Sequence, residues 1–134
     1  MIDIEDKIFD LLDTKLKEYN PDIFMSSMYV DAPAEFPCVT VMQKSTTTNP
    51  RGLTQEGESE YDNVMFEVNI YSNKCGGKKS EAKAISDIID STLLNLNFVR
   101  IMSEPVPNLP DVRIYRIVSR YRATVDKNET IYRG

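Results

Sequence analysis

The chain has 134 residues, of which 41% are hydrophobic and 28% are charged, and its formal net charge is −5. This length and composition are typical of one folded domain with its own core, and they exclude an intrinsically disordered chain. No stretch approaches the ~20 apolar residues of a membrane-spanning helix, and the first residues lack the pattern of a secretion signal. We therefore expect a single domain over residues 1–134 that is neither secreted nor inserted in a membrane.

The first expected element is an amphipathic helix from Ile4 to Leu16, which Asn20-Pro21 ends. Its apolar residues recur at intervals of three or four, and four aspartates align on the opposite face. A solvated helix surface is the plainer interpretation of these aspartates, and a docking surface is the alternative. The acidic ridge, as we call this set, consists of Asp3, Asp6, Asp10 and Asp13.

Three strands are expected next, at Ile23–Val30, Cys38–Gln43 and Val64–Tyr71, and only the third alternates cleanly between apolar and polar residues. A polar segment from Lys44 to Glu60 separates the second strand from the third. At ~17 residues it exceeds the usual loop length in compact domains, and such loops are commonly binding loops, lids or linkers. We expect this segment to be one long loop.

A second amphipathic helix is expected from Ala82 to Leu96, followed by a strand at Phe98–Met102 that a proline-containing segment ends. The last strand, Val112–Val125, has an apolar face and a face with three arginines. The resulting order, α-β-β-β-α-β-β, predicts an α+β two-layer sandwich: a mainly antiparallel sheet with two helices packed on one face.

The chain contains no histidine, which excludes Ser-His-Asp and Cys-His catalysis. Cys75 before the second helix is a weak candidate for a reactive thiol. The segment after it resembles a phosphate-binding loop but departs from the pattern twice, because Ser72 replaces the first glycine and Lys79 replaces the magnesium-binding hydroxyl residue. Aspartates stacked along an exposed helix cannot surround a cation. We expect no enzymatic activity, no catalytic residue, no cofactor and no metal.

Charge is unevenly distributed along the sequence. Residues 1–22 contain seven acids and three bases, a balance of −4, whereas residues 112–134 contain six bases and two acids, a balance of +4. An isoelectric point near 4.8 is unusual for a reader of double-stranded DNA. Pairing between the arginines of one copy and the acids of another is one interpretation. Arginines that are solvated or paired within the chain are the alternative.

Several of these features together resemble the tail terminator, or tail completion, proteins of long-tailed bacteriophages and prophages. They are the acidic first helix, the proline-rich link into Phe36–Val41, the long polar loop, the strand Tyr61–Ser72, the second helix and the run Arg113–Ala123. The resemblance covers nearly the whole chain and rests on the order and length of the segments. It involves no catalytic motif.

The resemblance implies a ring, typically hexameric, that caps the tail tube and presents a joining surface to the head connector. The implied partners are further copies of the chain, the tail tube protein and the head connector or neck protein, with no membrane and no sequence-specific nucleic acid. The implied location is the host cytoplasm during assembly and then the virion. The expected interface residues are Asp6, Asp10, Asp13, Thr47, Arg51, Thr54, Glu56, Glu58, Arg113, Arg116, Arg120 and Arg122.

Other interpretations of the sequence remain open. A head-completion or neck protein on the head side of the joint is the nearest, and it would also form a ring. A small interaction domain unrelated to phages and a cysteine-dependent or phosphate-handling enzyme are the more distant alternatives. For the long loop, a surface hairpin without a partner competes with a loop that neighbouring subunits or the tube would order.

Overall fold

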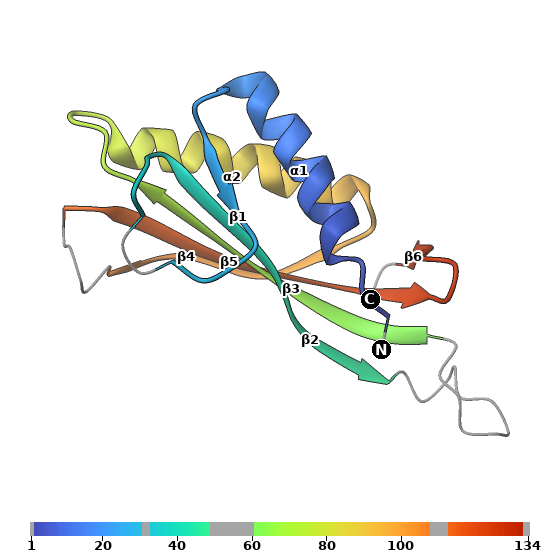
Figure 1. Cartoon of the computed structure of the whole chain (residues 1–134). Helices are drawn as coiled ribbons and strands as arrows, with labels where there is room; N and C mark the ends of the chain where they lie inside the picture. Colours follow the sequence, from blue (N-terminus) through green and yellow to red (C-terminus); the bar gives the residue numbers. More distant parts are fainter. Residues whose placement is uncertain (1, 31–32, 49–60, 108–112, 133–134) are drawn as a thin grey trace, which may run out of the picture.

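The protein folds as two layers, a six-stranded sheet and a pair of helices that cover one face of it (Figure 1). The computed structural model describes residues 2–30, 33–48, 61–107 and 113–132. The strand order is β1-β2-β3-β5-β4, and β6 also pairs with β5. The elements are α1 (Glu5–Tyr19), β1 (Phe24–Ser26), β2 (Cys38–Thr48), β3 (Tyr61–Ser72), α2 (Lys78–Asn95), β4 (Val99–Pro107), β5 (Tyr115–Asp126) and β6 (Ile131–Tyr132).

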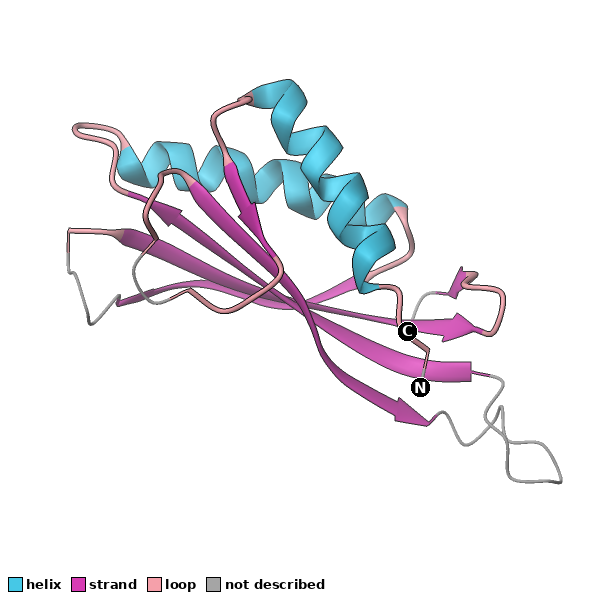
Figure 2. Ribbon diagram, viewed as in Figure 1, coloured by secondary structure: helices cyan, strands magenta, loops and turns pink. Residues whose placement is uncertain are grey.

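This architecture confirms the predicted α+β class and the predicted order of helices and strands, to which β6 adds a two-residue strand at the end. All neighbouring strands pair in the antiparallel sense except β1 and β2, which are parallel. Figure 2 shows both helices on the same side of the sheet. The sheet therefore has a helix face and an open face, on which neither α1 nor α2 lies.

The helix face holds the main core. The apolar stripe of each helix points into it, because positions three or four apart lie on one side of a helix. Phe66 of β3 meets Phe98 edge to face, with ring centroids 5.6 Å apart. The buried stripes consist of Ile8, Leu12 and Leu16 in α1 and of Ala82, Ile85, Ile89 and Leu93 in α2.

Polar contacts join the layers at several places, among them Gln43 of β2 and Asp90 of α2. On β2, the Gln43 amide bonds to the backbone of Ile2 and Ile4, and its backbone N–H donates to the Glu5 carboxylate. At the other side, Asp90 of α2 accepts hydrogen bonds from the Tyr121 hydroxyl and the Arg100 guanidinium, both at 3.1 Å. Burial, with the Asp90 charge beside it, raises the pKa of Tyr121. These contacts set where α1 and α2 lie along the strands.

The connection from β1 to β2 crosses the open face. Parallel strands cannot be joined by a tight turn, so the chain must return across the sheet before the second strand begins. On its way the carbonyl oxygen of Val30 accepts a 2.8 Å hydrogen bond from the Tyr71 hydroxyl. Phe36 packs on a small second core formed by Cys38, Tyr71 and Ile114. This connection buries one end of the open face.

The expected loop at 44–60 begins too early, because β2 continues through Lys44 to Thr48. A register shift between Gln43 and Ser45 lets the strand continue beside β3. Threonine is a good strand former despite its polarity, so the polar composition concealed this extension. The rest of the predicted loop, residues 49–60, lies outside the described residues.

Other strand boundaries also differ from the sequence predictions: β3 is longer than Val64–Tyr71, and β5 begins at Tyr115 and not at Val112. The first strand is limited to Phe24–Ser26, because the Ser26 hydroxyl and the backbone of Met28 form a local turn. The fourth strand does not end at Met102 but continues through Pro105 and Pro107. Prolines are tolerated there because β4 is an edge strand, whose outward-facing N–H groups have no ladder partner.

Replacing Phe66 by alanine should reduce the free energy of unfolding by about 3–5 kcal/mol, because the side chain is fully buried and leaves a cavity. Phe24→Ala is the matched control, since Phe24 is 38% exposed, and it should cost less than about 1 kcal/mol. Urea unfolding followed by circular dichroism measures both. Equal losses for the two variants would contradict this assignment of the core.

Candidate functional site

The arginines of β5 lie on the open face of the sheet. The alternate residues Ile117, Tyr121 and Ala123 belong to the core on the helix face, so the side chains between them point the other way. The predicted division of this strand into an apolar face and an arginine face is therefore correct.

Arg116 is held within its own chain. Its Nε and one terminal nitrogen donate to Oδ1 of Asn69 at 3.0 and 2.8 Å. The guanidinium carbon lies 5.5 Å from the ring centroid of Tyr71 and 5.8 Å from that of Tyr29. Contacts of this kind fix the guanidinium in place and use its planar face. Arg116 thus serves to hold the β1–β2 connection against the sheet.

Arg120 and Arg122 differ in their contacts although both are exposed. Arg120 donates to the Glu67 carboxylate at 3.2 and 3.3 Å, across the β3–β5 pair. Among the described residues, no side chain forms a hydrogen bond or ion pair with Arg122. Of the three arginines that share this face, Arg122 is therefore the one whose charge is best placed to meet another molecule.

Polar residues of β3 that the sequence analysis did not single out complete this surface. Glu67 and Asn69 are buried beside the arginines, and the signal for them was the polar residue at every second position of that strand. Within the described residues, Nδ2 of Asn69 and Oγ1 of Thr40 are buried without a hydrogen-bond partner. This part of the open face is a packed polar layer, not an empty site.

The acidic ridge of α1 is only partly free. Asp6 and Asp10 are exposed, whereas Asp13 forms a 3.1 Å ion pair with Lys17 one turn later. Asp3 lies before the helix and accepts a hydrogen bond from the backbone N–H of Glu5. Thr47 is exposed near the end of β2, and Arg113 lies exposed just before β5. Arg51, Thr54, Glu56 and Glu58 fall outside the described residues.

The fold turns the uneven charge of the sequence into a difference between two edges of the sheet. α1 packs over β2, next to the β1 edge, whereas β5 and β4 form the other edge. The described residues 2–22 contain the same seven acids and three bases and have a net charge of −4. The described residues from Arg113 to Tyr132 contain five bases and two acids, a balance of +3. The edge at β1 is therefore acidic, and basic residues gather on β5, one strand in from the edge at β4.

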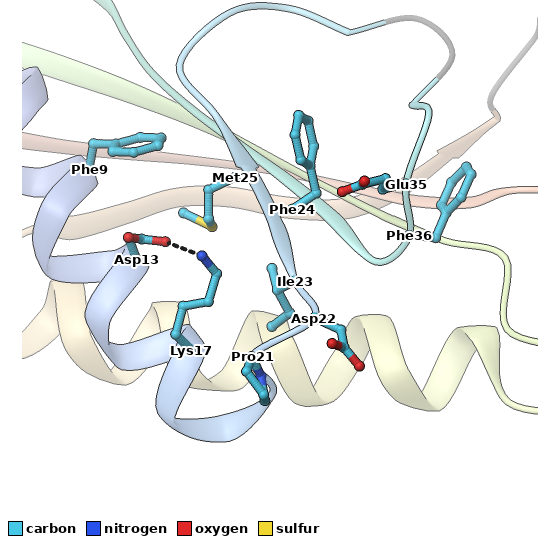
Figure 3. A pocket seen from close by; sticks show the side chains of 10 residues that line it. All are labelled: Phe9, Asp13, Lys17, Pro21, Asp22, Ile23, Phe24, Met25, Glu35 and Phe36. Carbon is cyan, nitrogen blue, oxygen red and sulfur yellow. Dashed lines mark ion pairs between the residues drawn. The ribbon is translucent and has the colours of Figure 1, made fainter.

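A groove of about 850 Å³ runs beside β1, the strand at the acidic edge (Figure 3). α1 contributes Phe9, Asp13 and Lys17 to its wall, and the connection from α1 to β1, β1 itself and the segment before β2 contribute the rest. The lining combines aromatic and acidic side chains. The remaining lining residues are Pro21, Asp22, Ile23, Phe24, Met25, Glu35 and Phe36.

Several apolar side chains between Tyr19 and Tyr29, the segment that includes β1, are exposed. Met28 is 73% exposed and Tyr29 is 54% exposed, and Tyr19 and Phe24 are also largely exposed. Solvent-exposed apolar residues that cluster at one place are typical of interaction surfaces. The sequence analysis missed this surface, and the signal for it was the lack of clean alternation between residues 23 and 30.

The segment before α2 forms hydrogen bonds within its own chain. Lys78 donates to the backbone oxygen of Arg113 at 2.9 Å, and the Ser72 hydroxyl bonds to the Glu81 carboxylate at 2.7 Å. Cys75 is exposed in the turn, and Gly76 adopts a positive φ of 72°. A carboxylate in the first helical turn disfavours a bound anion there.

Within the described part of the chain, no group of three or more histidine, cysteine, aspartate or glutamate side chains is placed to hold a metal ion. None of the helices in that part combines the length and the apolar character needed to cross a membrane.

In comparisons with known proteins, no family model and no curated protein matches this chain.

Arg116→Ala should lower the free energy of unfolding by about 1.5–3 kcal/mol. It removes two charge-assisted hydrogen bonds and leaves the side-chain oxygen Oδ1 of Asn69 buried without these donors. Arg122→Ala is the matched variant on the same strand face and should change it by less than about 0.5 kcal/mol. Chemical unfolding curves of the two variants and the parent give the comparison. Losses of the same size would mean that Arg116 is not a structural residue.

The two cysteines should react at very different rates. Cys75 is exposed and Cys38 is fully buried, and burial raises the pKa of the Cys38 thiol to about 11. Since the thiolate is the reactive form, one thiol per chain should react with a disulfide reagent at pH 8, and the second only after unfolding. Cys75→Ser should abolish the fast phase. Two fast phases in the native protein would contradict the burial of Cys38.

Proposed function

We propose that this protein is a structural component of a long-tailed bacteriophage. In this proposal, copies of the chain close into a ring, typically of six, that caps the tail tube and offers a joining surface to the head connector. The protein acts by binding and assembling and catalyses no reaction. The proposal draws on the resemblance in the order and length of its segments to tail terminator proteins.

The observation that carries the proposal is the opposite charge of the two sheet edges. A head-to-tail ring needs two different surfaces on each subunit that fit one another, and such a heterologous contact closes when the rotation between subunits is right. The β1 edge carries the exposed Asp22 and Glu35, and Arg122 lies exposed on β5, one strand in from the β4 edge. Complementary charges steer copies into this order and disfavour contacts between like edges.

Charge alone supplies little of the affinity of such a contact. Exposed ion pairs contribute about 0–1 kcal/mol each, so burial of apolar surface must add the rest. Phe24 in β1 and Met28 shortly after it provide exposed apolar area. Arg116 and Arg120 hold their own sheet together, so in this mechanism they shape the surface, while Arg122 meets the neighbouring copy.

Arg122→Glu should weaken assembly without unfolding the protein, because it places a like charge against the acidic edge of the next copy. Arg122→Lys is the control that keeps the charge. Light scattering at low and high protein concentration, with and without the tail tube protein of the same phage, measures the mass of each variant. Wild type should approach six copies, alone or with the tube protein, and added salt should reduce the assembly.

Two results would count against the proposal. Unchanged assembly of Arg122→Glu would reject the charge-based mechanism. If the wild-type protein stays monomeric and does not bind the tube protein, the tail-capping role is rejected. Binding to the portal or adaptor protein in place of the tube protein would instead assign the ring to the head side of the joint.

A further inference from the structure

Among the strands that the structure describes, β1 has a partner on one side only and presents its other backbone edge unpaired. It is the outermost strand of the sheet, and it is only three residues long. The N–H of Phe24 donates to the Pro37 carbonyl oxygen at 2.9 Å, toward β2. Because backbone groups of successive strand residues point to opposite edges, the N–H and C=O of Met25 point away from β2. They face the groove beside β1 and are ready to pair with another strand.

β4 presents the other free edge of the sheet. Its pairing with β5 runs through Pro105 and Pro107, and proline fits a ladder only where its nitrogen faces outward. By the same alternation, the N–H and C=O of Ser103 also face outward. The prolines leave the outer edge of the second half of β4 without these donors. Pairing with another strand is therefore confined to the first half of β4, and a strand of three residues such as β1 is short enough to pair there.

The strand directions allow the two edges to join. β1 runs parallel to β2, and each later step across the sheet is antiparallel. β1 and β4 therefore run in opposite directions within one subunit. When a rotation roughly parallel to the strands relates two copies, β1 of one copy meets β4 of the next as an antiparallel pair. This kind of pair is the more stable of the two.

We propose that copies of this chain join head to tail by adding β1 of one copy to β4 of the next, with Met25 opposite Ser103. The sheet then continues from subunit to subunit with all the helices on the same side. This inference rests on the self-association step of the proposed function, and it does not depend on the identity of the tube.

The side chains agree with this register. Met25 pairs with Val39 and Ser103 pairs with Ser119, and both partners point to the helix face. The groove beside β1 has the charged lining residues Asp13, Lys17, Asp22 and Glu35. The groove beside β4 has Lys83, Asp87, Arg100 and Glu104, so bases as well as acids line it, and the bases are available to pair with the acids of the β1 side. Ile101, which is 48% exposed, adds apolar area on the β4 side.

Pairing of like edges is less favourable. Two β1 strands would bring Asp22 and Glu35 of both copies together without a base from the opposite edge. Two β4 strands would place outward-facing prolines in the new ladder, where donors are missing. The fold thus favours the head-to-tail pairing over both symmetric ones.

Disulfide cross-linking tests the register directly. In this pairing Ser26 lies opposite Met102 as a non-hydrogen-bonded pair, with Cα atoms about 4.5 Å apart, which suits a disulfide. Within one chain these residues lie on opposite edges of the sheet, about 19 Å apart at ordinary strand spacing. Any disulfide between Ser26→Cys and Met102→Cys must therefore join two copies. A Cys75→Ser background removes the exposed native thiol.

The expected result is a cross-linked dimer when the two single variants are mixed under oxidising conditions. The double variant should give a ladder of multimers that ends at the size of the ring. Each single variant alone should stay uncross-linked. Disulfide-linked dimers of Ser26→Cys alone would overturn the head-to-tail pairing. So would the absence of a cross-link in mixed variants that light scattering shows to be assembled.

A proline substitution provides a second test. Met25→Pro removes the outward N–H without touching the bonds to β2, and Met25→Ala controls for the lost side chain. Assembly should fall at least tenfold in Met25→Pro relative to Met25→Ala, with both variants folded by circular dichroism. Equal assembly overturns the strand pairing while leaving a ring in place. A wild-type protein that never assembles, even with tube protein, overturns the proposed function and the pairing together.

Discussion

The parallel pairing of β1 with β2 is the constraint on which the rest of this structure depends. Because two parallel strands cannot share a tight turn, the chain must cross the sheet between them. The helices already occupy one face, so the crossing takes the other (Figure 1). It covers Cys38 and Tyr71 and brings Tyr29 over Arg116. The same pairing leaves β1 as a short, open edge beside a groove.

The arginines of β5 show how a charged strand can serve the fold and an interface at once. Arg116 and Arg120 are bound to Asn69 and Glu67 of β3, so their charges stiffen the sheet across its longest strand pair. Arg122 has no such contact within the described residues and stays exposed. A partner that approaches this edge would meet a rigid polar surface with one readily available guanidinium. Rigid surfaces lose little entropy when they bind.

The two edges of the sheet are complementary in charge and in backbone geometry, and these are independent properties. The charge difference arises from α1 on one side and β5 on the other. The backbone match arises from a short β1 and from prolines that close half of β4. Exposed edges are ordinarily protected against uncontrolled pairing. Here the short β1 and the prolines of β4 protect the edges only in part. They restrict pairing between copies to a short ladder with a defined register.

The sequence by itself determined the class of the fold, because the helices have clear periodicity and β3 and β5 alternate, and these patterns depend only on local geometry. It also identified the arginine face of β5 and the acidic residues of α1. It could not determine where β2 and β4 end, since a bulge at Gln43 and an edge position for Pro105 depend on neighbouring strands. Which arginine is bound, which edge is open and how the charges divide between the edges were decided only by the tertiary structure. Each depends on segments such as β3 and β5 that are far apart in sequence and meet only when the sheet forms.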